Sequence, residues 1–315
     1  MKPDGLPGRD TTMRRLAGIF ALILAGGCVP LTPYAEVRAR LPTESLIEVD
    51  GRQAHVARSG SGEPVVMLHG FGASAYSWRH VTAALSSDYE LIAIDLNGFG
   101  YTERPRSAAG YTVAGQLALV LGVMDALGIA KAHFAGHSYG GALATLLAWR
   151  HPDRVRSLVL VDSAATAYPW DRRNQSAGFI PLTYLFVRTR AIKRDAVLAG
   201  LERSFADDSQ ITPELVDEYY ERIRIEGVSR AFRGLTKPTS EPRELPDLAR
   251  LDLPILMVWG AEDELTELES AREVAEILPR AELEVLDGVG HIPLEESPGR
   301  LAELMGAFLA RHRAG

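Results

Sequence analysis

The stretch Lys131-Ala132-His133-Phe134-Ala135-Gly136-His137-Ser138-Tyr139-Gly140-Gly141 decides how this chain folds. Its first residues form a short apolar run typical of a buried strand, and its last residues lead into a helical run over 142–149. Between the two lies a Gly-x-Ser-x-Gly sequence centred on Ser138, which is typical of a sharp strand-to-helix turn. Such a turn needs glycines because the serine backbone is strained and neighbouring chain passes too close for a Cβ. The stretch therefore predicts a serine hydroxyl raised above the edge of a sheet.

Strands and helices alternate along most of the remaining chain. A hairpin with its turn at Asp50-Gly51 comes first, because this dipeptide suits a tight turn between two alternating runs. The later buried strands are predicted over 64–68, 90–95, 155–162, 254–259 and 281–286, and the helices over 78–85, 112–127, 267–278 and 298–313. This alternation predicts an α/β fold with a mostly parallel central sheet and helices on both faces.

The serine turn resembles the nucleophile elbow of the α/β-hydrolase family. In that family the acid and then the histidine follow the serine along the chain. Here Gly260-Ala261-Glu262-Asp263 and Gly288-Val289-Gly290-His291 each follow a predicted strand, in that order. The resemblance covers about residues 45–313. It implies an α/β-hydrolase core over 44–164 and 248–315, interrupted by a mainly helical lid over 165–247.

These strand-end loops carry the expected catalytic residues. A serine hydroxyl becomes a good nucleophile when a base takes its proton and a third group orients that base. We therefore expect Ser138 to attack, His291 to take and return the proton, and Asp263 to orient His291. Asp162, at the end of the strand after the elbow, is the main alternative acid, and Glu262 is a weaker one.

The developing negative charge of an acyl-transfer intermediate needs two N–H donors. One expected donor is the backbone amide of Tyr139, and the family pattern implies the amide of Phe71 as the other. His69, two residues before Phe71, is expected to brace this loop and is also a candidate for the substrate pocket. The aromatic side chains expected to line that pocket from the lid are Trp170, Phe179, Tyr184 and Phe186, with packing of the lid onto the core as the alternative.

The amino terminus predicts export from a bacterium. A charged start at 13–15 precedes an apolar run that is short for a membrane span, which is typical of a signal segment. Cys28 lies in a sequence that resembles the lipobox of bacterial lipoproteins, although Ala25 departs from the usual leucine. We expect residues 1–28 to be the signal segment, with a possible overhang at 1–12, and residues 29–43 to be a tether. Lipid on Cys28 would anchor the protein to the cell envelope; an ordinary cleaved signal or an uncleaved anchor is the alternative.

Composition narrows the range of partners. The net charge is −7 and no basic patch stands out, which argues against nucleic acid. The single cysteine permits no internal disulfide, and no metal-ligand spacing or cofactor motif is present in the sequence. The expected partner is a small ester-type molecule with no cofactor, and the oligomeric state stays open.

The identity of the nucleophile selects among the reactions of the family. His69-Gly70-Phe71 and Tyr76-Ser77-Trp78-Arg79 resemble the epoxide hydrolase and dehalogenase branch, whose nucleophile is aspartate. Attack by Ser138 on an epoxide would leave an ether that water does not open, so serine favours acyl transfer and carboxylic esters. One alternative is hydrolysis of a C–C bond in ring-cleavage diketones, although Gly72-Ala73-Ser74 and His80 differ from the usual sequence of those enzymes. An alternative of another class is a non-catalytic ligand-binding module that retains the three residues.

Overall fold

The computed structural model describes residues 31–164, 193–236 and 246–313. The predicted signal segment with Cys28 and the lid aromatics Trp170, Phe179, Tyr184 and Phe186 lie outside these residues. The interpretations attached to them therefore stay predictions. Among the described helices, none combines the length and the hydrophobicity that crossing a bilayer requires.

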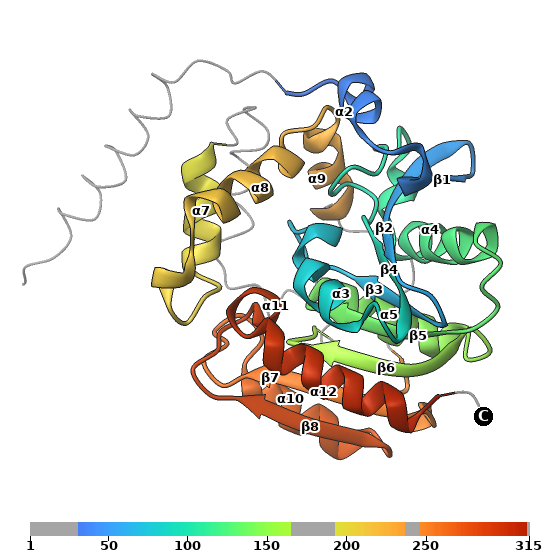
Figure 1. Cartoon of the computed structure of the whole chain (residues 1–315), viewed down its shortest axis with the longest axis vertical. Helices are drawn as coiled ribbons and strands as arrows, with labels where there is room; N and C mark the ends of the chain where they lie inside the picture. The colour runs from blue at the N-terminus through green and yellow to red at the C-terminus, as the bar shows by residue number, and fades with distance from the viewer. Residues whose placement is uncertain (1–30, 165–192, 237–245, 314–315) are drawn as a thin grey trace, which may run out of the picture.

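A twisted eight-stranded sheet forms the centre of the molecule (Figure 1). The strand order is β1-β2-β4-β3-β5-β6-β7-β8, in which β2 pairs antiparallel with β1 and β4 while the other neighbours are parallel. Asp50 and Gly51 both have positive φ in the β1–β2 turn, which suits the predicted hairpin. The predicted mostly parallel sheet is confirmed. Its strands are β1 (Leu46–Val49), β2 (Arg52–Ser59), β3 (Glu63–Leu68), β4 (Tyr89–Ile94), β5 (Ala132–His137), β6 (Val155–Val161), β7 (Ile255–Gly260) and β8 (Ala281–Leu286).

Helices cover both faces of the sheet and explain why its central strands are apolar throughout. On β3, Val65 and Met67 pack toward the face covered by α3 (Arg79–Leu85) and α12 (Pro298–Arg311). Val66 and Leu68 point to the opposite face, which is covered by α4 (Val113–Ala126), α5 (Tyr139–Arg150) and α10 (Leu268–Ile277). Each fully buried side chain of this size contributes about 1.5–3 kcal/mol, so both faces stabilise the sheet.

Three helices lie between β6 and β7 in the described part of the chain. They are α7 (Arg194–Glu202), α8 (Pro213–Ile223) and α9 (Val228–Thr236), which lie together beyond one edge of the sheet in Figure 1. Thr212 caps α8 by accepting the amide of Leu215 at 3.2 Å, and Pro213 occupies the first turn. Phe232 of α9 packs edge to face on Phe71, at 5.4 Å between ring centroids. These inserted helices therefore reach the loop that follows β3.

The amino-terminal segment joins the inserted helices. Thr32 donates its amide to Arg224 O at 2.8 Å and accepts the amide of Glu226 at 2.9 Å. Helix α2 (Tyr34–Arg40) follows this bridge. The remaining short segments are α11 (Pro293–Glu296) and 3-10 turns at Thr43–Ser45, Ala75–Trp78, Ala108–Tyr111, Asp208–Gln210 and Leu248–Arg250.

Candidate active site

Ser138 occupies a strained turn between β5 and α5. Its backbone has φ 48° and ψ −114°, and its amide donates to Val161 O at 2.9 Å. A Cβ on Gly136 would lie 2.5 Å from Gly140 O, and a Cβ on Gly140 would lie 2.3 Å from Leu68 O. Both positions therefore require glycine. A backbone outlier of this kind costs about 1–3 kcal/mol and is found where function needs it.

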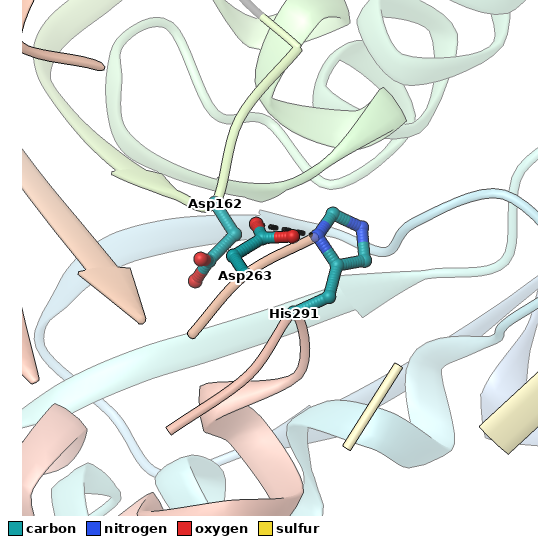
Figure 2. A group of neighbouring side chains, drawn as sticks. All are labelled: Asp162, Asp263 and His291. Atoms are coloured by element: carbon teal, nitrogen blue, oxygen red, sulfur yellow. Dashed lines mark hydrogen bonds and ion pairs between the residues drawn. The ribbon is translucent and has the colours of Figure 1, made fainter. Parts of the chain in front are cut away.

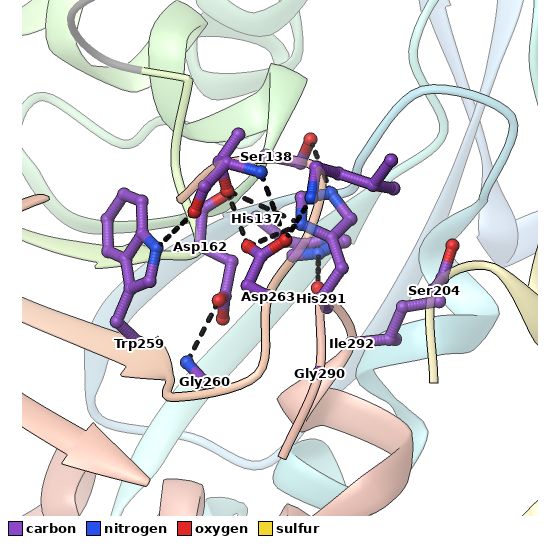
Figure 3. A network of polar contacts seen from close by, with 12 residues as sticks. His137, Ser138, Asp162, Ser204, Trp259, Gly260, Asp263, Gly290, His291 and Ile292 are labelled. Atoms are coloured by element: carbon purple, nitrogen blue, oxygen red, sulfur yellow. Dashed lines mark hydrogen bonds and ion pairs between the residues drawn. The ribbon is translucent and has the colours of Figure 1, made fainter. Parts of the chain in front are cut away.

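Three side chains from separate loops form a hydrogen-bonded relay (Figure 3). His291 Nε2 lies 3.0 Å from Ser138 Oγ, and His291 Nδ1 lies 2.8 Å from Asp263 Oδ2. His291 and Asp263 are 7% and 6% exposed, so the relay is largely shielded from water. Because Asp263 accepts from Nδ1–H, the lone pair of Nε2 faces the serine hydroxyl. The imidazole is therefore oriented to remove the proton of Ser138.

Asp263 is held as a carboxylate by several donors. Its Oδ1 accepts the amides of Leu265 at 2.7 Å and Thr266 at 3.0 Å, and its Oδ2 accepts the Thr266 hydroxyl at 2.6 Å. Burial opposes ionisation, but the hydrogen bond and charge of His291, with the Thr266 hydroxyl, outweigh it and lower the pKa of Asp263 to about 2. Asp263 is therefore ionised at neutral pH.

Asp162 lies beside this relay but is oriented differently. Figure 2 shows its carboxyl group turned away from the His291 ring, which Asp263 faces. Its Oδ1 accepts the Gly260 amide at 2.9 Å. Burial and the nearby charge of Asp263 raise the pKa of Asp162 well above its ordinary value. Of the two candidate acids, Asp263 is the one in contact with His291.

The loop after β3 lies against the nucleophile. A Cβ on Gly70 would be 3.3 Å from Ser138 Cβ, so a side chain at this position of the loop would crowd the nucleophile. The Phe71 and Tyr139 rings meet edge to face, with centroids 6.5 Å apart. Tyr139 is the first residue of α5, and the amides of a first helical turn point toward negative charge beyond the helix end. The two residues expected to donate N–H groups thus contact each other, and each is next in sequence to a residue of this close approach, Gly70 or Ser138.

His69 braces the loop after β3 from within the core. His69 is fully buried; its Nε2 accepts the Leu96 amide at 3.0 Å, so its Nδ1 donates to Gly70 O at 2.7 Å. Burial lowers the pKa of His69, which agrees with a neutral ring. These contacts occupy both ring nitrogens and agree with the bracing role, leaving His69 no polar atom for a substrate.

A family model described as alpha/beta hydrolase fold matches residues 63–298 of this chain. The chain belongs to the α/β-hydrolase fold family. This confirms the family suggested by the elbow sequence.

Known members of the family include hydrolases of different substrates. The 2-hydroxymuconate semialdehyde hydrolase of Pseudomonas sp. (strain CF600) is 32% identical over 271 residues, which are 82% of this chain and 91% of that protein. Lipase 1 of Psychrobacter immobilis is 26% identical over 288 residues, 87% of this chain and 86% of that protein. The solved structure of a meta-cleavage product hydrolase from Pseudomonas fluorescens IP01 has a TM-score of 0.72 at 30% identity, and covers 85% of this chain and 98% of that one. The protein is thus a hydrolase of this family, and its substrate requires separate argument.

Asp95, Glu296 and His137 support the site of this hydrolase, although no sequence motif assigned them that role. Asp95, after β4, accepts the Ala75 amide at 2.6 Å, the Tyr101 amide at 2.7 Å and His55 Nδ1 at 2.7 Å. Burial opposes its ionisation, but the charge and hydrogen bond of His55, together with donors such as the Ala75 amide, outweigh burial and lower the pKa of Asp95 below its ordinary value. The sequence signal that could have identified Asp95 is its position at the end of a buried strand, directly before a glycine-rich loop.

The other two are Glu296 and His137, which hold the backbone around His291. Glu296 accepts the amides of Gly290 at 3.0 Å, Ile292 at 3.3 Å and Ala206 at 2.7 Å. His137 Nε2 lies 2.7 Å from His291 O. The bond of His137 to His291 and that of Glu296 to Ala206 have no signature in the sequence, because each joins segments that are distant along the chain.

Asp162, Asp263 and His291 are also the described residues whose grouping resembles a metal site. One ligand atom from each lies within 4.8 Å of the others. The His291 Nδ1 atom of this group is already hydrogen-bonded to Asp263, as the relay requires. Two members of the group, Asp263 and His291, therefore face each other as proton transfer requires.

Proposed function

We propose that this hydrolase cleaves carboxylic esters through an acyl-enzyme formed on Ser138. The observation that carries the proposal is the relay, in which His291 Nε2 lies 3.0 Å from Ser138 Oγ and Nδ1 lies 2.8 Å from Asp263 Oδ2. A serine placed beside an oriented base is the arrangement that acyl transfer requires.

The first half-reaction joins Ser138 to the acyl group. His291 Nε2 takes the hydroxyl proton as Oγ attacks the ester carbonyl, and the carbonyl oxygen becomes negatively charged. Amides of Phe71 and Tyr139 stabilise that oxygen, a contribution of roughly 10²–10³ in rate for one such donor. The imidazolium stays next to Asp263, whose pKa of about 2 keeps it charged. His291 then gives the proton to the alcohol oxygen as the ester C–O bond breaks.

Water completes the cycle by the same route. His291 takes a proton from water, the hydroxide oxygen bonds to the acyl carbon, and the proton returns to Ser138 Oγ as the acyl–serine bond breaks. The products are a carboxylic acid and a free serine. The relative named as a lipase supports an ester substrate, since its sequence aligns with 87% of this chain.

Hydrolysis of a C–C bond is the second candidate. It is favoured by the 32% identity to a 2-hydroxymuconate semialdehyde hydrolase. Against it stands the loop after β3, where Gly72-Ala73-Ser74 replaces the sequence usual in enzymes of that reaction. Ser74 there caps the turn at Ala75–Trp78 by accepting the Tyr76 amide at 3.3 Å.

Rates on both substrate classes decide between the candidates. We expect kcat/KM on p-nitrophenyl acetate, butyrate or octanoate to exceed that on 2-hydroxymuconate semialdehyde. Ser138→Ala should reduce the ester rate by at least about 10³-fold, because it removes the nucleophile. Faster turnover of the semialdehyde would favour the second candidate. Equal rates for the wild type and Ser138→Ala, with no adduct from a fluorophosphonate, would favour a non-catalytic binding module.

A further inference from the structure

His137 contacts three parts of the site at once. It is the last residue of β5, next to Ser138, and its ring is 4% exposed. The ring centroid lies 5.0 Å from that of His291, and a Cβ on Gly70 would lie 2.6 Å from His137 Nδ1. The ring therefore fills the space between the elbow, the His291 loop and the loop after β3.

The contact with His291 is a hydrogen bond of known direction. His137 Nε2 lies 2.7 Å from the carbonyl oxygen of His291, and a carbonyl only accepts. Nε2 therefore carries the hydrogen, while Nδ1 has no hydrogen-bond partner within the described residues. Burial, with the like charge of His291, lowers the pKa of His137 to about 3, so the ring is neutral at neutral pH.

The backbone of His291 is consequently held on both sides. Its carbonyl accepts from His137 (Figure 3). Its amide donates to Ser204 O at 2.7 Å, in the segment after α7. The flanking amides of Gly290 and Ile292 donate to Glu296. Among these contacts, that of His137 starts from the residue bonded to Ser138. It thus connects the backbone of the base, through one hydrogen bond, to the residue next to the nucleophile.

We propose that His137 is a positioning residue whose Nε2–H donor fixes the His291 loop at the distance from Ser138 that proton transfer requires. His291 lies on the loop after β8, whereas Ser138 follows β5, and strands β6 and β7 separate β5 from β8 in the sheet. Two such loops need a direct connection to hold a 3.0 Å contact. A displacement of about 1 Å between reacting groups can reduce a rate by about 10²-fold.

The test compares variants that keep or remove the donor. In His137→Gln the side-chain amide nitrogen reaches the position of Nε2, whereas His137→Met has similar length and no donor. His137→Asn places its amide near Nδ1, out of reach of the His291 carbonyl, and serves if the Met variant fails to fold. The readout is the rate of Ser138 labelling by a fluorophosphonate, which rests on the proposed serine chemistry but on no particular ester.

We expect the Met and Asn variants to lower the maximal labelling rate about 10- to 100-fold while the half-saturating probe concentration changes by less than about threefold. The Gln variant should stay within about threefold of the wild type. Equal rates in all variants would overturn the proposal, and so would an equal loss in all three, which would assign the effect to ring packing.

A second measurement is independent of catalysis. Amide hydrogen exchange at 288–292 should accelerate in the Met and Asn variants and remain unchanged in the Gln variant. If the wild type is not labelled at all, the proposed function fails, and the exchange data alone decide the positioning proposal. Unchanged exchange in every variant would overturn it.

Discussion

The ends of β6 and β7 each carry a buried aspartate, yet the two carboxyl groups differ in charge. Asp162 is 0% exposed and Asp263 is 6% exposed. Asp263 accepts two amides and a hydroxyl and contacts His291, whereas Asp162 accepts the Gly260 amide. The pKa of Asp263 falls to about 2, and burial raises the pKa of Asp162. Burial opposes the ionisation of both groups, and the donors around Asp263, with the contact to His291, outweigh it only there.

The difference in charge also gives Asp162 and Asp263 different roles. An acid that orients an imidazole must be charged and must reach Nδ1, and Asp263 meets both conditions. Asp162 has φ 40° and directs its carboxyl group away from His291 (Figure 2). We infer that Asp162 supports the end of β7 through the Gly260 amide, as a neutral acid beside the charged one.

Substitution of Asp263 should lower the catalytic rate more than any other change considered below. Asp263→Asn replaces an acceptor with an amide whose N–H opposes the required tautomer of His291, so kcat should fall by roughly 10³–10⁴-fold. The measurement is kcat and KM on p-nitrophenyl butyrate. Asp162→Asn is the matched control. Its kcat should stay within about tenfold of the wild-type value, because Asp162 does not contact His291. A greater loss in the control than in Asp263→Asn would place the functional acid on β6.

The two aspartates should also change the free energy of unfolding in opposite directions with pH. The folded pKa of Asp263 lies below its ordinary 3.8, so its stabilisation is present above about pH 4 and is lost as pH falls through about 2. That loss is roughly 2 kcal/mol. The folded pKa of Asp162 is raised, so its contribution is present below 3.8 and is lost as pH rises through the raised value.

Urea unfolding from pH 2 to 8 measures both effects. The stability of Asp162→Asn relative to the wild type should increase from pH 4 upward, since asparagine does not titrate. The stability of Asp263→Asn relative to the wild type should increase as pH falls below 4. Parallel pH dependence in the two variants would show that the two carboxyl groups share one environment.

Removal of one donor from Asp263 should have the smallest effect. Thr266→Val deletes the hydroxyl that lies 2.6 Å from Asp263 Oδ2 but keeps the shape of the side chain and both backbone donors. We expect kcat to fall about three- to tenfold, equivalent to about 1 kcal/mol. Thr266→Ser retains the hydroxyl and should keep most of the rate. Equal rates for the Val and Ser variants would show that the hydroxyl does not support the charge.

The main elements of the site could be predicted because their signals are local. Ser138 lies in a glycine turn, and Asp263 and His291 follow apolar strands in the order that the family uses. Parallel strands bring those ends to one edge of the sheet, so the three side chains meet. Asp95, His137 and Glu296 could not be assigned their supporting roles in this way. His137 and His291, for example, are 154 positions apart, and nothing near either residue indicates their hydrogen bond.

The sequence by itself determined the alternation of strands and helices, the glycines of the elbow and the chain order of serine, acid and histidine. These features depend on neighbouring residues, through side-chain periodicity and the backbone freedom of glycine. Only the tertiary structure decided that Asp263 rather than Asp162 contacts His291, and that His137 and Glu296 hold the histidine loop. Charge state and loop position depend on burial and on donors from distant segments, and these come together only in the folded chain.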